Sequence, residues 1–183
     1  MRIISGKYKG RAFHPPANLP VRPTTDFAKT GLFNVLSNRI EFSDCKCLDL
    51  FSGTGSISVE LASRGCKSIL SIDRDFGCIG FLNQTAIKLG EKNIKAVKSD
   101  VFKYLLSCRE KFDLIFADPP FDAVYRNDIH KMVFEKNLLT DSGLLVIEHA
   151  SDITMEHLPF FDFEKSYGNV RFSFFHKFET EPS

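Results

Sequence analysis

The stretch FDLIFADPPF, residues 112–121, decides the fold of this 183-residue chain. Residues 112–117 form an apolar run that is typical of a strand buried on both faces of a parallel sheet. Asp118 and Pro119 each precede a proline, which disfavours helical geometry at both positions, and neither proline carries a backbone N–H. The sequence therefore predicts a stiff corner at the carboxyl end of a strand. It offers a carboxylate, carbonyl acceptors and the ring of Phe121, a set that suits a planar partner with an N–H₂ group.

Strands and helices alternate around this stretch. Apolar runs predict strands at residues 45–50, 68–72, 94–98, 112–117 and 143–148. Helical spacing and capping residues predict helices at residues 25–38, 56–64, 75–89, 101–108 and 125–138. A short turn at 167–169 joins two further strands, which makes that last pair antiparallel. The chain is thus predicted to be an α/β protein, with a mostly parallel central sheet and an antiparallel C-terminal strand.

The first residues form a separate feature. Residues 1–16 predict a small N-terminal β-hairpin, and a proline-containing connector follows it. We expect one domain over 1–183, with a hairpin and connector arm at 1–24 and a core at 25–183. The whole chain has a formal net charge of +1, yet residues 1–25 contain no acid and five basic residues, Arg2, Lys7, Lys9, Arg11 and Arg22. Such an arm is typical of a polyanion contact and equally of a solvated surface.

A glycine-containing turn, Asp49-Leu-Phe51-Ser-Gly53-Thr-Gly55, lies between the first predicted strand and its helix. Glycines at such a turn let the backbone approach a ligand closely. The third glycine of a dinucleotide fingerprint is missing, since Ser58 stands there, so the motif alone is equally consistent with a tight turn that binds nothing.

Acids close four successive predicted strands, at Asp49, Asp73, Asp100 and Asp118. The carboxyl ends of parallel strands line one crevice, where ligands bind. Asp73 is placed to accept from a ribose diol, and Asp100 from an adenine amine. Four acids on one edge favour a cationic nucleoside over a pyrophosphate.

The cysteines, the N-terminal segment and the apolar runs indicate the cellular compartment of the protein. The five cysteines form no C-x-x-C pair and are odd in number, which disfavours a disulfide framework or zinc site and favours a reducing compartment. Cys45 and Cys47 share one strand face and are expected in the core. The N-terminus lacks an apolar signal core, and no apolar run approaches the length of a membrane span. We therefore expect a cytoplasmic protein with no metal site.

The motif set resembles that of the S-adenosylmethionine-dependent amino-methyltransferases. Residues 2–11, 22–26, 32–34 and 167–168 narrow the resemblance to the RsmD family, the bacterial small-subunit (16S) ribosomal RNA guanine-N2 methyltransferases. The resemblance implies a Rossmann-like class I methyltransferase fold, S-adenosylmethionine as cofactor, and ribosomal RNA or the small ribosomal subunit particle as partner of a monomer. Residues 27–31 depart from the family, where this segment is usually more highly charged.

The resemblance also implies roles for individual residues. The catalytic set is Asp118, Pro119, Pro120 and Phe121. The cofactor-binding set is Asp49, Phe51, Gly53, Gly55, Asp73, Asp100, Val101 and Thr24. The substrate RNA would meet Arg2, Lys7, Lys9, Arg11 and Arg22.

Two other functions stay open from the sequence. The corner would accept equally from an adenine amine, so an adenine-N6 methyltransferase of DNA or RNA is one alternative. A non-catalytic RNA-binding or assembly module with the same fold is the other. A nicotinamide dehydrogenase is disfavoured, because the third glycine is absent.

Overall fold

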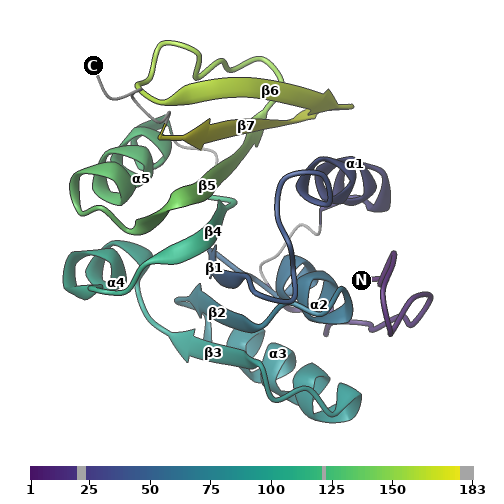
Figure 1. The fold of residues 1–183 in the computed structure, drawn as a ribbon. Coiled ribbons are helices and arrows are strands. Elements are labelled where there is room, and N and C mark those ends of the chain that lie inside the picture. The colour runs from purple at the N-terminus through teal and green to yellow at the C-terminus, as the bar shows by residue number, and fades with distance from the viewer. Residues whose placement is uncertain (20–23, 121–122, 178–183) are drawn as a thin grey trace.

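A seven-stranded sheet forms the centre of the molecule, with helices on both faces (Figure 1). The structure is a computed structural model, and it describes residues 1–19, 24–120 and 123–177. The strand order is β3-β2-β1-β4-β5-β7-β6. Strands β1 to β5 run parallel to one another, as the sequence predicts.

The elements follow the predicted alternation closely. The strands are β1 Lys46–Leu50, β2 Ser68–Asp73, β3 Ile94–Lys98, β4 Phe112–Ala117, β5 Leu139–Ala150, β6 Phe161–Tyr167 and β7 Val170–His176. The helices are α1 Asp26–Leu36, α2 Ser56–Ser63, α3 Phe76–Leu89, α4 Val101–Ser107 and α5 Ala123–Glu135. Helices α1, α2 and α3 cover one face of the sheet, and α4 and α5 cover the other (Figure 1).

The C-terminal part of the sheet confirms the expected antiparallel strand. Strand β7 pairs antiparallel with β5, where Val146 lies opposite Phe174, and antiparallel with β6 on its other side. The turn between β6 and β7 is closed by Gly168 with a φ of 64°. The last strand in the sequence therefore lies inside the sheet, and β6 forms its edge.

Two predicted boundaries near β5 are wrong. Strand β5 begins at Leu139 and not at residue 143, and α5 ends at Glu135 and not at residue 138. Residues 139–143 contain the turn-forming set Asp-Ser-Gly, which concealed the strand. Leu139 pairs with Phe112 of β4, and an irregularity in the ladder precedes the next pair, Leu114 with Leu144. Pairing with β4 therefore places these residues in a strand, although their own sequence favours a turn.

The N-terminal arm folds back on itself as the predicted hairpin. A single antiparallel bridge joins Arg2 to Ala12. Beside this bridge the N–H of Ile3 donates to the Arg11 carbonyl and the N–H of Phe13 to the Met1 carbonyl. The hairpin also binds α2, because the backbone N–H groups of Ile4 and Ser5 donate to the buried carboxylate of Glu60, at 2.7 and 3.0 Å. The arm is thereby fixed against α2.

None of the helices in the described ranges is long and apolar enough to cross a lipid bilayer.

Candidate functional site

The glycine turn lies between β1 and α2 and has an unusual backbone. Three of its residues have positive φ: Phe51 at 58°, Gly53 at 51° and Gly55 at 80°. A positive φ is costly for a residue with a side chain, so Phe51 is held there by its surroundings. The backbone N–H of Gly53 donates to the carboxylate of Asp73 at 2.8 Å, which ties the turn to the end of β2.

We predict that Gly55→Ala destabilises the protein by about 1–3 kcal/mol. A Cβ at Gly55 would lie 2.3 Å from Cδ1 of Leu82, in addition to the strain of its positive φ. Gly90→Ala is the matched control, since Gly90 has a φ of 72° and a Cβ there meets nothing within 4 Å. Urea unfolding should show the larger loss for Gly55→Ala. Equal losses of unfolding free energy in the two variants would show that the contact with Leu82 does not destabilise Gly55→Ala.

The four predicted acids lie at the carboxyl ends of four neighbouring strands, along one side of the sheet, but their environments differ. Asp73 accepts from the N–H groups of Gly53 and Asp75, both at 2.8 Å. Asp100 is exposed and caps α4 by accepting from the N–H of Lys103 at 3.0 Å. Asp49 is 1% exposed and accepts from the hydroxyl of Ser58. Asp49 therefore lies buried beneath the turn. From there it can affect a ligand only by supporting the structure of the turn.

An aromatic pocket of about 130 Å³ opens at this edge. Its lining comes from the glycine turn, the residues after β2 and β3, the proline corner and α5, namely Phe51, Arg74, Asp100, Val101, Phe102, Pro120 and Tyr125. The ring of Phe102 lies 6.4 Å from that of Phe51 and 5.5 Å from that of Tyr125. The structure thus brings four predicted site residues together: Phe51, Asp100, Val101 and Pro120.

Sequence reasoning left three lining residues out of the predicted set. Arg74 and Phe102 each follow a predicted cofactor residue directly, at Asp73 and Val101. That adjacency was the available signal. Tyr125 comes from α5, beyond the corner, and only the fold brings it to the pocket.

Two buried carboxyls, Asp49 and Glu148, and the half-buried Asp118 lie beside the pocket. Burial raises the pKa of Asp49 to about 7, helped by the charges of Asp118 and Asp73. Burial likewise raises the pKa of Asp118 to about 7. Glu148, 7% exposed, has its pKa raised to about 9 by burial and then by Asp118. Three carboxyls that disfavour each other's ionisation share this site.

Glu148 was missed from the sequence, although a signal existed. The register pairs Ala117 with Ile147, so Asp118 and Glu148 follow directly on neighbouring strands. The hydroxyl of Thr24, a predicted cofactor residue, donates to the Glu148 carboxyl at 3.3 Å. Glu148 closes the predicted strand 143–148, as the other four acids close theirs.

We predict that Glu148 makes stability fall as pH rises. Its pKa is raised from 4.5 in the unfolded chain to about 9, so the folded state holds a proton that the unfolded state has lost. The fall spans pH 4.5 to about 9. Glu148→Gln removes this titration, and the urea midpoint of the variant should decline less between pH 7 and 9. Glu156→Gln, on the exposed surface, is the control. Parallel profiles for Glu148→Gln and wild type would contradict the shift.

The basic residues of the arm are exposed and lie along α2. Arg2 lies near the start of α2, since buried Lys29 donates both to its carbonyl and to the Ser56 hydroxyl. Burial lowers the pKa of Lys29. Lys7 pairs with Glu91 at 2.5 Å and lies over the ring of Tyr8. Of the other predicted RNA contacts, Lys9 and Arg11 are exposed, and Arg22 lies outside the described residues, as does Phe121 of the corner.

The segment that departs from the family packs against the β6–β7 turn. The exposed ring of Phe27 makes an edge contact with Tyr167, with centroids 5.7 Å apart. A Cβ at Gly31 would lie 2.1 Å from the Tyr167 ring, so only glycine fits beneath it. In this segment, packing against the Tyr167 ring takes the place of the charged residues that the family usually has.

The strand order, the glycine turn and the acidic edge together define a class I methyltransferase fold, the S-adenosylmethionine-dependent class. The Thermus thermophilus 16S rRNA N2 methyltransferase RsmC shares this fold with a TM-score of 0.68 at 20% identity, over 87% of this chain and 45% of that one. The chain belongs to the family described as Conserved hypothetical protein 95, whose model matches residues 1–176, and this confirms the predicted RsmD family.

Individual relatives are similar over most of their length. The ribosomal RNA small subunit methyltransferase D of Buchnera aphidicola subsp. Baizongia pistaciae is 31% identical over 153 residues, 84% of this chain and 78% of that one. A hypothetical protein from Thermus thermophilus matches with a TM-score of 0.83 at 25% identity, over 97% of this chain and 99% of that one.

Proposed function

We propose that this protein transfers a methyl group from S-adenosylmethionine to the exocyclic N2 amine of a guanine in small-subunit ribosomal RNA. One observation carries the proposal: Pro120 of the acceptor-only corner lines the aromatic pocket at the carboxyl edge of the sheet. A cofactor in that pocket and an amine on the corner would therefore be neighbours. The family relatives named ribosomal RNA small subunit methyltransferase D support the RNA class.

The residues around the pocket fit the proposed cofactor. The pocket has aromatic walls for a flat base, and Asp100 at its rim can accept from an exocyclic amine. Asp73 can accept from a ribose diol, and the positive φ of Gly53 and Gly55 shapes the turn beside it. S-adenosylmethionine would supply an electrophilic methyl on a sulfonium cation, and an edge rich in carboxyls favours that charge.

The corner can hold and orient the amine. The Asp118 carboxylate and the Pro119 carbonyl are acceptors, so both can receive hydrogen bonds from one N–H₂ group. These bonds fix the nitrogen for in-line attack, and positioning of this kind contributes much of the acceleration in methyl transfer. A stacking role for Phe121 remains part of the proposal.

Asp118 is also suited to take the proton that the amine loses. The product nitrogen carries the new methyl and one hydrogen, so one proton must leave. A carboxyl with a pKa of about 7 is a far better acceptor near neutral pH than an ordinary aspartate. Glu148, with a pKa of about 9, stays protonated there and so leaves the negative charge on Asp118.

The exposed cations of the arm would hold RNA phosphates along α2, from Arg2 near its start to Lys7 near its end. Phosphate contacts give affinity that falls with salt and carry little sequence information. The arm therefore supports binding of a large RNA, and the choice of base rests with the corner.

The test is methyl transfer to 16S rRNA and to small-subunit particles from cells that lack this protein. Labelled S-adenosylmethionine is supplied, and the digested nucleosides are identified by mass spectrometry. We expect N2-methylguanosine. Labelled N6-methyladenosine would support the adenine alternative, and RNA binding without any transfer would support the non-catalytic module.

A further inference from the structure

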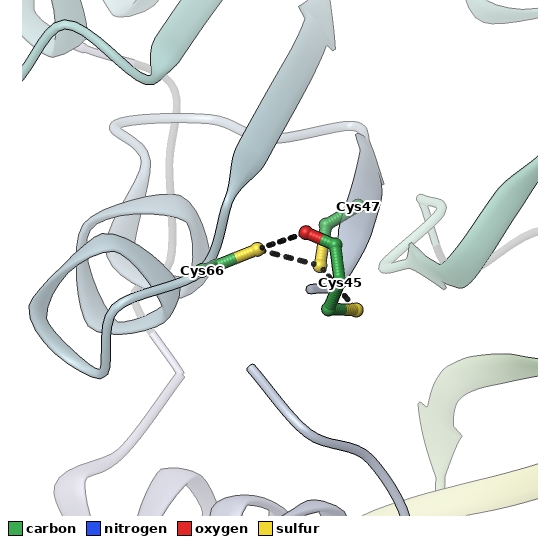
Figure 2. Close-up of side chains that lie close together, drawn as sticks. All are labelled: Cys45, Cys47 and Cys66. Atoms are coloured by element: carbon green, nitrogen blue, oxygen red, sulfur yellow. Dashed lines mark hydrogen bonds between the residues drawn. The ribbon is translucent and has the colours of Figure 1, made fainter. Parts of the chain in front are cut away.

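Three buried cysteines meet at the amino end of β1, at the opposite end of that strand from the glycine turn (Figure 2). Cys45 precedes β1, Cys47 lies within it, and Cys66 lies in the connection between α2 and β2. Their side chains are 2%, 0% and 1% exposed. All three are free thiols.

The sulfur atoms converge on one point. The Sγ of Cys47 lies 3.4 Å from that of Cys45 and 3.2 Å from that of Cys66. All three sulfurs lie within 4.8 Å of one another. Metal–thiolate bonds are about 2.3 Å long, so three sulfurs around one ion in a plane are about 4 Å apart. The cluster needs only small side-chain shifts to reach that geometry.

The ligand set selects among metals. Thiolates favour Cu(I), zinc and iron–sulfur clusters. Structural zinc takes four nitrogen or sulfur ligands, and iron–sulfur clusters are held by four cysteines. Within residues 1–19, 24–120 and 123–177, only these three residues form such a group. We propose that Cys45, Cys47 and Cys66 form a three-coordinate thiolate site for a soft ion of the Cu(I) class.

Proton release and access are both feasible. Binding displaces the thiol protons to solvent, because the ion is held by thiolates. Exposed residues flank the buried sulfurs in sequence: Ser43 and Asp44 precede Cys45, and Gly65 and Lys67 flank Cys66. Along the chain, Cys45 and Cys66 each lie one residue from an exposed residue.

The spacing explains why the sequence did not indicate the site. Cys45 and Cys47 form a C-x-C pair on one strand face, and Cys66 follows 19 residues after Cys47. The crossover through α2 returns the chain beside the start of β1 and brings this third sulfur to the pair.

The test is an anaerobic titration of the reduced, metal-free protein with Cu(I) against a chromophoric Cu(I) chelator. We expect one equivalent to bind, with thiolate-to-copper charge-transfer absorption and an X-ray absorption spectrum that shows sulfur neighbours only. Loss of an outer-shell partner of a metal ligand costs about 10–100-fold in affinity, so Cys47→Ala and Cys66→Ala should each cost more than about 100-fold.

Cys78→Ala and Cys108→Ala are the matched controls, because both thiols are buried elsewhere, and their affinity should equal that of wild type. Thermal melting of the metal-free variants reports folding. If Cys47→Ala fails to fold, the test rests on Cys66→Ala, because Cys66 lies in a loop and not in a strand. Unchanged affinity in Cys66→Ala, or tighter retention of Zn²⁺ than of Cu(I), would overturn the proposal. Methyl transfer is measured separately, since this cluster lies away from the pocket.

Discussion

Asp118→Ala should reduce methyl transfer by about 10²–10⁴-fold while S-adenosylmethionine still binds with nearly wild-type affinity. The variant loses both the acceptor that orients the amine and the group suited to take its proton. The proposed cofactor contacts lie mainly on the glycine turn, Asp73 and the aromatic pocket, which the substitution leaves in place. Single-turnover transfer to small-subunit particles and calorimetry with S-adenosylmethionine measure the two quantities.

The folded state should tolerate this substitution well. Asp118 lies among carboxyls whose pKa values are raised by its charge, so its removal relieves repulsion on Glu148 and Asp49. The melting temperature of Asp118→Ala should therefore equal or exceed that of wild type, which separates lost chemistry from lost folding. Asp128→Ala, on the exposed side of α5, is the control and should retain full activity. Turnover within a few-fold of wild type in Asp118→Ala would remove this carboxylate from the reaction.

Asp73→Ala should weaken S-adenosylmethionine binding by about 10–150-fold, because a hydrogen bond to a charged group contributes about 1.5–3 kcal/mol. The same carboxylate accepts from the N–H of Gly53, so its loss also frees the turn that shapes the pocket. Calorimetric titration with S-adenosylmethionine measures the change, and unfolding in urea measures the accompanying loss of stability.

Asp44→Ala is a suitable control for this experiment. Asp44 is an exposed acid at the amino end of β1, so the charge change is the same and the cofactor edge is untouched. Its affinity should match wild type. If Asp73→Ala also binds the cofactor as tightly as wild type, Asp73 makes neither the proposed ribose contact nor a necessary contribution to the turn.

The sequence predicted most of the fold, because local signals and topology rules agree over residues 45–117. Apolar runs alternate with capped helices, and a parallel sheet follows from that alternation. The prediction was wrong where a long-range contact overrides a local signal. The first residues of β5 look like a turn and become strand through pairing with β4. The N-terminal arm forms the predicted hairpin, but its additional bonds to Glu60 of α2 are not indicated by its own sequence.

The site was predictable in position more than in chemistry. Acids at strand ends located the edge of the sheet, and Pro120, Phe51 and Asp100 do meet there. The protonation of the carboxyls depends on burial and on which strands are neighbours. Asp118 and Glu148 are 30 residues apart in the chain, and only the β4–β5 register makes them adjacent.

The place of β7 has a consequence for how the protein is made. Among the described strands, β6 pairs with β7 alone, and β7 follows β6 in the chain. While the nascent chain emerges, β6 therefore lacks its native partner strand until residues up to His176 have left the ribosome exit tunnel. Until then β5 presents an unpaired edge, and this interval is when the growing polypeptide is most exposed to misassembly with other chains.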